Sequence, residues 1–298
     1  MFELDLMENL VELHNDLIKG KYNHGSYVSF RVNYPKPRHI HKASIRDRLL
    51  HHAIHRILYP EFDKKFISDS YSCRINKGTH KAIKRFEIFS KKASLNNIRT
   101  CWVLKCDIKK FFDSIDHEIL ISILNKNISD EKVVKLLEKI IESFHKCSNK
   151  GLPLGNLTSQ LLVNIYINEF DHFVKHELRI KYYIRYADDF VVLSPDRGYL
   201  EEIFPIIESF LNSTLKLSIH PNKISINTMA SGIDFLGWVH FPDHCVLRTS
   251  TKRRMLKNIT KPYVKDEVMQ SYLGLLSHGN TFKLQKEVRS LVSTQNLP

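Results

Sequence analysis

The chain has 298 residues, of which 43% are hydrophobic and 26% charged, and this ordinary globular composition excludes wholesale disorder. Lysine and arginine outnumber aspartate and glutamate by 45 to 32, which gives a net charge of +13. A bias of this size favours a polyanionic partner such as nucleic acid, although a generally basic protein would show it too. No apolar run approaches the roughly 20 residues that span a bilayer, so we expect no membrane segment.

Cysteine and histidine usage bears on the compartment and on metal binding. The five cysteines are scattered, odd in number and without a C-x-x-C pair, which predicts reduced thiols in the cytoplasm and argues against a zinc site. The sixteen histidines include a group for which we expect a solvated or RNA-facing role rather than metal binding: His39, His41, His51, His52 and His55. The N-terminus, MFELDLMENL, is acidic and amphipathic, unlike a secretory signal.

Hydrophobic spacing divides the chain into helical and strand-like segments without a regular β-α-β rhythm. In chain order we expect a helix at 1–20, a strand at 26–34, a basic segment at 36–55 running into a helix, a strand at 101–107, a helix at 133–144, a loop at 151–155 feeding a helix, a hairpin at 183–193, a helix at 199–215, short strands near 224–226 and 233–240, and a basic helical tail from 249. This order favours an α+β fold over a doubly wound one.

Two adjacent aspartates, Asp188 and Asp189, interrupt the apolar stretch RYADDFVVL. Neighbouring like charges in a buried strand repel each other and lose hydration, so they need compensation. Asp107 stands at the carboxyl end of another apolar strand, in WVLKCDIKKFFD. If the two strands are neighbours in one antiparallel sheet, the three carboxylates converge, and hard oxygen ligands of this kind suit Mg²⁺. Taken alone, a D-D pair is also compatible with an exposed acidic turn.

The box YADD at residues 186–189 resembles the Y-x-D-D box of reverse transcriptases. Further blocks similar to that family, and closest to its group II intron class, follow in the expected order: PKPR, SIRDRLLHHAI and SYSCRINKGTHKAI in the fingers, the Asp107 segment as motif A, GLPLGNLTSQ at 151–160 as motif B, LKLSIHPNK at 215–223 as motif D and FLGW at 235–238 as the primer grip. The resemblance implies a right-hand polymerase fold that copies RNA into DNA. It implies fingers at 1–100, a palm at 101–247 with insertions at about 118–150, and a short basic thumb at 248–298.

The resemblance assigns catalytic roles to the acids and to one lysine. Asp107 and Asp188 would hold two Mg²⁺ ions with the Ile108 carbonyl as a further ligand, and Asp189 would support them. Two such ions could activate an attacking hydroxyl and stabilise a leaving pyrophosphate. Lys223 would donate a proton to the pyrophosphate, or is merely a solvated lysine.

The resemblance also predicts the nucleotide pocket and the primer contact. Lys36 and Arg38 would grip the triphosphate of the incoming nucleotide. Phe112, five residues after Asp107, would exclude a 2′-hydroxyl and select deoxynucleotides, unless it is an ordinary core phenylalanine. The primer grip would consist of Phe235, Leu236, Gly237 and Trp238.

Motif B departs from the common Q-G-x-x-x-S-P pattern, because Leu154 replaces glutamine and Gln160 replaces proline in LGNLTSQ. This variant is similar to the one in reverse transcriptases of diversity-generating retroelements, which miscopy template adenines. An aliphatic side chain removes a hydrogen-bonding anchor under the nascent base pair, and a looser pocket discriminates less. Neutral drift in a faithful enzyme is the alternative.

The implied partners are a template RNA, a cDNA or primer, dNTPs and a basic oligomeric accessory variability protein, in the cytoplasm of a prokaryote or encoded by a phage. The basic segment TKRRMLKN after FLGW suits the phosphates of a template–primer duplex, or is a solvated helix face. The chain after FLGW leaves room for a small thumb but not for an RNase H, maturase or endonuclease domain. Two alternatives remain: a faithful retron-like, group II-derived or phage-defence reverse transcriptase, and a non-enzymatic RNA-binding module, which would have damaged metal ligands.

Overall fold

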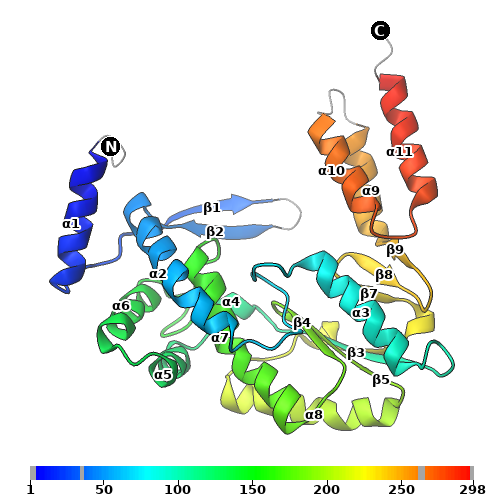
Figure 1. Cartoon of the computed structure of the whole chain (residues 1–298), viewed down its shortest axis with the longest axis horizontal. Coiled ribbons are helices and arrows are strands. Elements are labelled where there is room, and N and C mark those ends of the chain that lie inside the picture. The colour runs from blue at the N-terminus through cyan, green and yellow to red at the C-terminus, as the bar shows by residue number, and fades with distance from the viewer. Residues whose placement is uncertain (1–4, 34–36, 261–265, 296–298) are drawn as a thin grey trace.

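The computed structural model describes residues 5–33, 37–260 and 266–295. Its centre is a four-stranded antiparallel sheet in the order β4 (Tyr183–Tyr186), β5 (Asp189–Ser194), β3 (Trp102–Asp107) and β6 (Ser225–Thr228). Figure 1 shows this sheet with α1 and α2 to one side and α9–α11 to the other. Strands far apart in the chain are therefore neighbours, as the sequence predicted for the strands of Asp107 and Asp189.

Successive side chains along each strand of the central sheet point to opposite faces and pack in two different hydrophobic cores. Leu104 and Phe190 belong to a large hydrophobic core with α7 (Leu157–His172) and α8 (Arg197–Thr214). Val103 and Val191 belong to a second core with α3 (Thr79–Ala93) and β7. This period of two is the one that a sheet covered on both faces requires.

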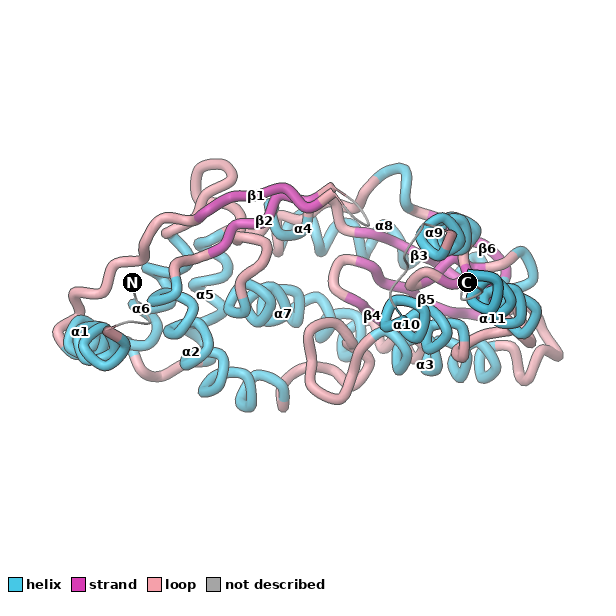
Figure 2. Tube along the Cα trace, turned by 90° about the horizontal axis from the view of Figure 1, so that it is seen from above, coloured by secondary structure: helices cyan, strands magenta, loops and turns pink. Residues whose placement is uncertain are grey.

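The N-terminal part combines helices with an exposed hairpin. α2 (Ile45–Asp63) and α5 (His117–Asn127) pack on α7, and α6 (Glu131–Glu142) packs on α5. α1 (Leu6–Ile18) lies beyond them at the outer edge of the molecule (Figure 1). β1 (Val28–Val32) pairs with β2 (Arg38–Lys42), and Figure 2 shows this hairpin leading toward the central sheet. Short helical turns complete this part and the central sheet: α4 (Phe111–Ser114), a π-helical turn at Phe173–Glu177, and 3₁₀ turns at Pro221–Lys223 and Met229–Ser231.

The C-terminal part has its own small core. β7 (Ile233–Phe235), β8 (Trp238–His240) and β9 (Cys245–Leu247) form an antiparallel sheet, followed by α9 (Thr249–Ile259), α10 (Asp266–Leu276) and α11 (Phe282–Gln295). Trp238 is 1% exposed and lies among the apolar side chains of the three helices. Gly279 lies against this ring, since a Cβ at Gly279 would stand 2.1 Å from Trp238 Cζ3. A glycine is required there because any side chain would collide with the indole.

Three expectations need correction. The strand β2 lies within the segment we predicted only as basic, because its sequence RHIHK has no apolar alternation and its side chains are largely exposed. Residues 233–240 form a hairpin, because Leu236 (φ 51°) and Gly237 (φ 89°) turn the chain between β7 and β8. His51 was expected to be solvated, but it is 1% exposed on the inner face of α2.

Among the described residues, no helix combines the length and apolar character needed to cross a bilayer. The cysteines are free thiols, of which Cys73 and Cys147 are exposed and the other three buried.

Candidate active site

The three predicted acids meet at one end of the central sheet. Asp107 is the last residue of β3 and lies directly opposite Asp189, the first residue of β5. Directly opposed residues of an antiparallel pair project from the same face, so these two carboxylates share a face. Asp188 lies in the two-residue turn between β4 and β5, after Ala187 with φ 54°. The Ile108 N–H donates to the Asp188 carbonyl at 3.0 Å, which ties this turn to the end of β3.

The environment of Asp188 and Asp189 opposes the ionisation of their carboxyl groups. Burial, and then the charge of Asp107, raises the pKa of Asp188 above its usual range. Burial raises the pKa of Asp189 to about 6; the Lys105 ammonium opposes this shift, and the charges of Asp188 and Asp107 add to it. Asp107 itself is 8% exposed. The site therefore has more negative charge than the surrounding protein neutralises.

A lysine from the predicted motif D reaches this site. The Lys223 Nζ lies 2.7 Å from Asp107 Oδ1 in an ion pair, and the Lys223 side chain is 46% exposed. Its backbone is held in place because the His220 N–H donates to the Asp107 carbonyl at 2.8 Å and the Lys223 N–H donates to the His220 carbonyl at 2.9 Å. A cation thus faces the acids from the segment before β6.

The donor atoms fit a hard divalent cation. Three carboxylates offer oxygen atoms only, which Mg²⁺ prefers, and their mutual repulsion falls when a cation binds between them. The Lys223 side chain is 46% exposed, so a cation bound at Asp107 can replace the ammonium as the partner of this carboxylate and leave Lys223 solvated. These residues can therefore accept Mg²⁺ together with a phosphorylated substrate, which completes the coordination of such ions.

Residues 33–240 match the model of the family described as reverse transcriptase (RNA-dependent DNA polymerase). The chain belongs to this family. It is 26% identical over 280 residues to "Protein YkfC" of Escherichia coli, and the aligned region covers 80% of this chain and 72% of YkfC. It is 32% identical over 201 residues to the "Group II intron-encoded protein LtrA" of Lactococcus lactis, and the aligned region covers 65% of this chain and 30% of LtrA.

Solved structures support the fold. Apo telomerase from Candida tropicalis superimposes with a TM-score of 0.60 at 11% identity, over 97% of this chain and 61% of the telomerase chain. Telomerase from Candida albicans superimposes with a TM-score of 0.58 at 12% identity, over 92% of this chain and 55% of that one. At these identities the likeness shows the fold alone, and it confirms the predicted α+β, right-hand polymerase architecture. The reverse transcriptase spans little more than half of these telomerases and less than a third of LtrA.

In this reverse transcriptase, the segment predicted as motif B is hydrogen-bonded to the β1–β2 hairpin. The His41 N–H of β2 donates to the Leu154 carbonyl at 2.9 Å, and Asn156 Nδ2 donates to the His41 carbonyl at 2.8 Å. Gly155 has φ +111°, and a Cβ there would stand 2.6 Å from Ile40 Cγ2, so the close approach of β2 requires glycine. The Leu154 side chain is half-buried at this junction, and the Gln160 side chain is half-buried in the first turn of α7.

The remaining predicted nucleotide-binding residues are distributed around the same region. Arg38 begins β2, and its positive charge lowers the pKa of Asp188, against the larger effects that raise it. Phe112 is half-buried in α4, and its carbonyl accepts from the Leu152 N–H at 2.8 Å, so motif A and motif B are adjacent. Lys36 lies outside the described residues.

The FLGW segment contains two buried and two half-buried residues. Phe235 and Trp238 are 0% and 1% exposed and pack in the second and third cores. Leu236 and Gly237 form the turn between β7 and β8 and are half-exposed. Within this segment the turn alone leaves the Leu236 side chain and some backbone partly exposed, while Phe235 and Trp238 hold the turn in position.

Two residues near the site were missed by sequence reasoning. Lys105 faces Asp189 and its Nζ donates to the Asp234 carbonyl at 2.5 Å, which joins the central sheet to β7. Its position two residues before Asp107 on the same strand face was the available signal. Asn156, 3% exposed, connects motif B to β2 through both ends of its amide, and no spacing in the sequence predicts such a contact.

Proposed function

We propose that this reverse transcriptase copies a retroelement template RNA into cDNA by two-metal nucleotidyl transfer, and that it is the error-prone enzyme of a diversity-generating retroelement. The observation that supports the chemistry is the convergence of Asp107, Asp188 and Asp189 at the end of β3 and β5. Their presence and position oppose the interpretation as a non-enzymatic RNA-binding module.

In this proposal Asp107 and Asp188, with the Ile108 carbonyl, hold two Mg²⁺ ions and Asp189 supports them. When bound, the ions make the primer 3′-hydroxyl a better nucleophile and offset the charge that grows on the leaving pyrophosphate. The protein holds the reacting groups in place: the paired ends of β3 and β5 fix the carboxylates, and the Ile108 N–H fixes the turn that carries Asp188.

The cations and the aromatic ring have separate roles in the proposal. Lys36 and Arg38 grip the triphosphate, and Lys223 leaves Asp107 to protonate the pyrophosphate as it departs. Phe112 lies under the sugar and excludes a 2′-hydroxyl. The adjacency of Phe112 to motif B and the ion pair of Lys223 with Asp107 support these assignments.

The proposed loss of fidelity rests on motif B. Leu154 and Gln160 lie on the segment that β2 and α4 contact, so their side chains can affect the pocket under the nascent base pair. An aliphatic side chain at 154 forms no hydrogen bond with either a matched or a mismatched base pair. It therefore gives the pocket no means of favouring the matched pair. The same chemistry offers no reason why adenine should be the base that is miscopied.

The proposed partners are template RNA, a DNA primer, dNTPs and a basic accessory variability protein, in a prokaryotic or phage setting. The net charge of +13 supports the nucleic-acid partners. We propose fingers at 1–100, a palm at 101–247 and a thumb at 248–298. The hydrophobic core around Trp238 joins the last two parts, because it contains Trp238 and Leu247 together with side chains of α9, α10 and α11.

The identity with LtrA supports a second candidate, a faithful group II-derived reverse transcriptase. A retron-like or phage-defence enzyme would have the same palm chemistry. These candidates differ from the first in fidelity rather than in the reaction that they catalyse.

Sequencing of cDNA distinguishes the candidates. The purified protein, with its accessory partner, copies an RNA that contains all four bases in mixed order. We expect errors concentrated at template adenines, and we expect the double variant Leu154→Gln, Gln160→Pro to reduce them by about tenfold, the scale of one lost pocket contact. Errors spread evenly over the four template bases would exclude the mutagenic role and leave the faithful enzyme.

A further inference from the structure

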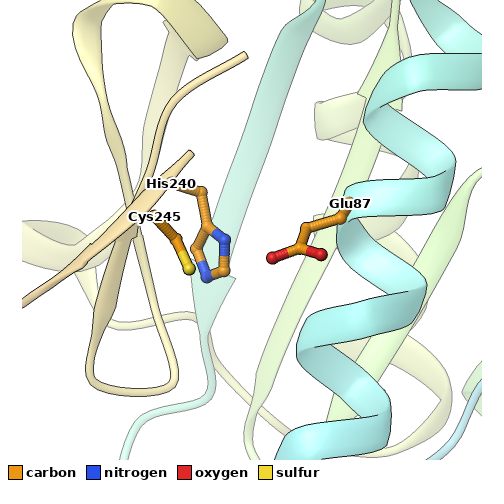
Figure 3. Close-up of side chains that lie close together, drawn as sticks. All are labelled: Glu87, His240 and Cys245. Atoms are coloured by element: carbon orange, nitrogen blue, oxygen red, sulfur yellow. The ribbon is translucent and has the colours of Figure 1, made fainter. Parts of the chain in front are cut away.

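A second cluster of ionisable side chains lies away from the three aspartates. Glu87 on α3, His240 at the end of β8 and Cys245 at the start of β9 point toward one another (Figure 3). One donor atom from each, a carboxylate oxygen, a ring nitrogen and the Sγ, lies within 4.8 Å of the other two. The three residues therefore bring one oxygen, one nitrogen and one sulfur donor to a common point.

His240 has no hydrogen-bond partner in this position. The residue is 1% exposed, and neither ring nitrogen has a partner among the described residues. A buried imidazole without a partner is costly, and such groups in native proteins often mark a water or an ion that completes the structure.

A cavity borders the cluster and gives access to it. Its volume is about 500 Å³, and Glu87 and Cys245 line it together with the turn at 241–244 and the loop at 277–280. It has room for a water molecule as a fourth ligand and provides a path by which an ion can enter. The Cys245 Sγ lies 3.7 Å from the His278 carbonyl, a weak contact that a stronger ligand could replace.

We propose that Glu87, His240 and Cys245 bind one Zn²⁺ ion, with the fourth position open to the cavity. Sulfur and nitrogen donors select a borderline transition metal over Mg²⁺ or Ca²⁺, and zinc accepts Cys, His and Glu together in a tetrahedral site. Zinc–ligand bonds of roughly 2.0–2.3 Å place the donors roughly 3.4–3.7 Å apart, so the donor atoms need to approach one another by only about 1 Å.

The proposed ion joins two parts of the reverse transcriptase. Glu87 belongs to α3, whereas His240 and Cys245 lie on either side of the turn between β8 and β9. The stacking of His80 of α3 on His278, with ring centroids 3.6 Å apart, is a second contact between α3 and the C-terminal part. The zinc thus fixes α3 against the small sheet that carries the FLGW turn, and it acts on stability rather than on chemistry.

The spacing of the ligands explains why the sequence did not predict this site. His240 and Cys245 are separated by four residues, and Glu87 lies far away on a helix, so these three ligands do not form a C-x-x-C or H-x₃₋₅-H pair with one another.

Metal analysis of the full-length protein tests the proposal. The protein is freed of metal, reconstituted with Zn²⁺ and freed of excess ion, and its zinc content is then measured by mass spectrometry. We expect about one zinc per chain. Zinc binding should be more than about hundredfold weaker in Cys245→Ser and Glu87→Gln, which exceeds the effect of changing a group that only orients a ligand. Cys147→Ser, which removes an exposed thiol, and Asp188→Asn, which alters the polymerase site, should keep the ion.

Cobalt substitution tests the proposal on the wild-type protein alone, so its result does not depend on whether a variant folds. Co²⁺ bound by Cys245 should give a thiolate-to-cobalt charge-transfer band in the near ultraviolet, and addition of Zn²⁺ should remove it. Chelation should lower the Tm of the wild type. A wild-type protein without this band and without zinc after reconstitution would overturn the proposal, as would equal zinc content in Cys245→Ser.

Discussion

Two charged clusters lie close together on the β4–β5 hairpin. The charges of one cluster are neutralised within the protein, and those of the other are not. Arg185 of β4 and Asp171 of α7 are both 0% exposed and form an ion pair, with Nη2 2.7 Å from Oδ2 and Nε 2.8 Å from Oδ1. Further bonds complete the pair: the Tyr183 hydroxyl donates to Asp171, and Arg185 donates to Ser70, Asn164 and the Ala187 carbonyl. Every charge in this cluster is neutralised from within the protein.

Asp188 and Asp189 follow Arg185 by three and four residues, and the protein supplies too little positive charge to neutralise them. Burial and mutual repulsion raise the pKa values of Asp188 and Asp189, and the Lys223 ammonium that pairs with Asp107 is 46% exposed. A closed ion pair of the Arg185 kind fixes the fold, whereas an excess of negative charge leaves a place for cations that arrive with the substrate. Variants of the two clusters should therefore affect different properties.

The largest expected effect is on catalysis. Asp188→Asn should lower the rate of Mg²⁺-dependent primer extension by about 10³-fold or more, beyond the tenfold to hundredfold typical of groups that only orient a metal ligand. The Tm of the metal-free variant should equal or exceed that of the wild type, because a repulsive charge is removed. Asp113→Asn, the same change near motif A, is the control and should keep nearly full activity. A near-wild-type rate of primer extension by Asp188→Asn would show that Asp188 has no catalytic role.

Breaking the closed pair should instead affect stability. Asp171→Asn leaves the Arg185 charge buried without its partner, and we expect unfolding to become easier by about 3–5 kcal/mol, measured by urea denaturation. The double variant Asp171→Leu, Arg185→Met should lose less than the single variant, because it leaves no uncompensated charge. A cost under about 1 kcal/mol for Asp171→Asn would show that Arg185 is solvated.

The smallest effect is a pH dependence of stability in the absence of metal. Because burial raises the pKa of Asp189 to about 6, its carboxylate destabilises the fold at neutral pH, and this penalty disappears as the pH falls from above 6 toward 4. Asp189→Asn should thus be more stable than the wild type by on the order of 2 kcal/mol at neutral pH. The difference should vanish near pH 4 in parallel urea titrations of the two proteins. A difference independent of pH would contradict the repulsion between the acids.

The two clusters also differ in how far the sequence predicted them. The three acids were predictable because each ends or interrupts an apolar run, and period-two alternation with antiparallel pairing places such residues together. The closed pair was not predicted, because Asp171 lies on a helix and Arg185 on a strand, and local spacing does not encode a contact between the two. His51 was misplaced for the same reason: a polar side chain on a helix is read as exposed unless its tertiary partners are known.

The fold was predictable to a similar extent. Helices and strands with strong apolar periodicity, such as β3 and α6, lie close to the expected segments. β2 was not predicted, because its register with β1 and its bonds to motif B, rather than apolar residues, make it a strand. The cluster of Glu87, His240 and Cys245 depends on the packing of α3 against β8 and β9, which no short motif records.

Cleavage of the backbone by bound iron tests the central claim most directly. Fe²⁺ takes the place of Mg²⁺ among carboxylates and, with ascorbate and peroxide, generates hydroxyl radicals that cut the nearby chain. We expect cuts near residue 107 and within 186–190, suppressed by excess Mg²⁺ and lost in the Asp107→Asn, Asp188→Asn double variant. Cleavage confined to other segments, or cleavage at these two segments that Mg²⁺ and the double variant leave unchanged, would contradict a shared divalent-cation site at the three aspartates.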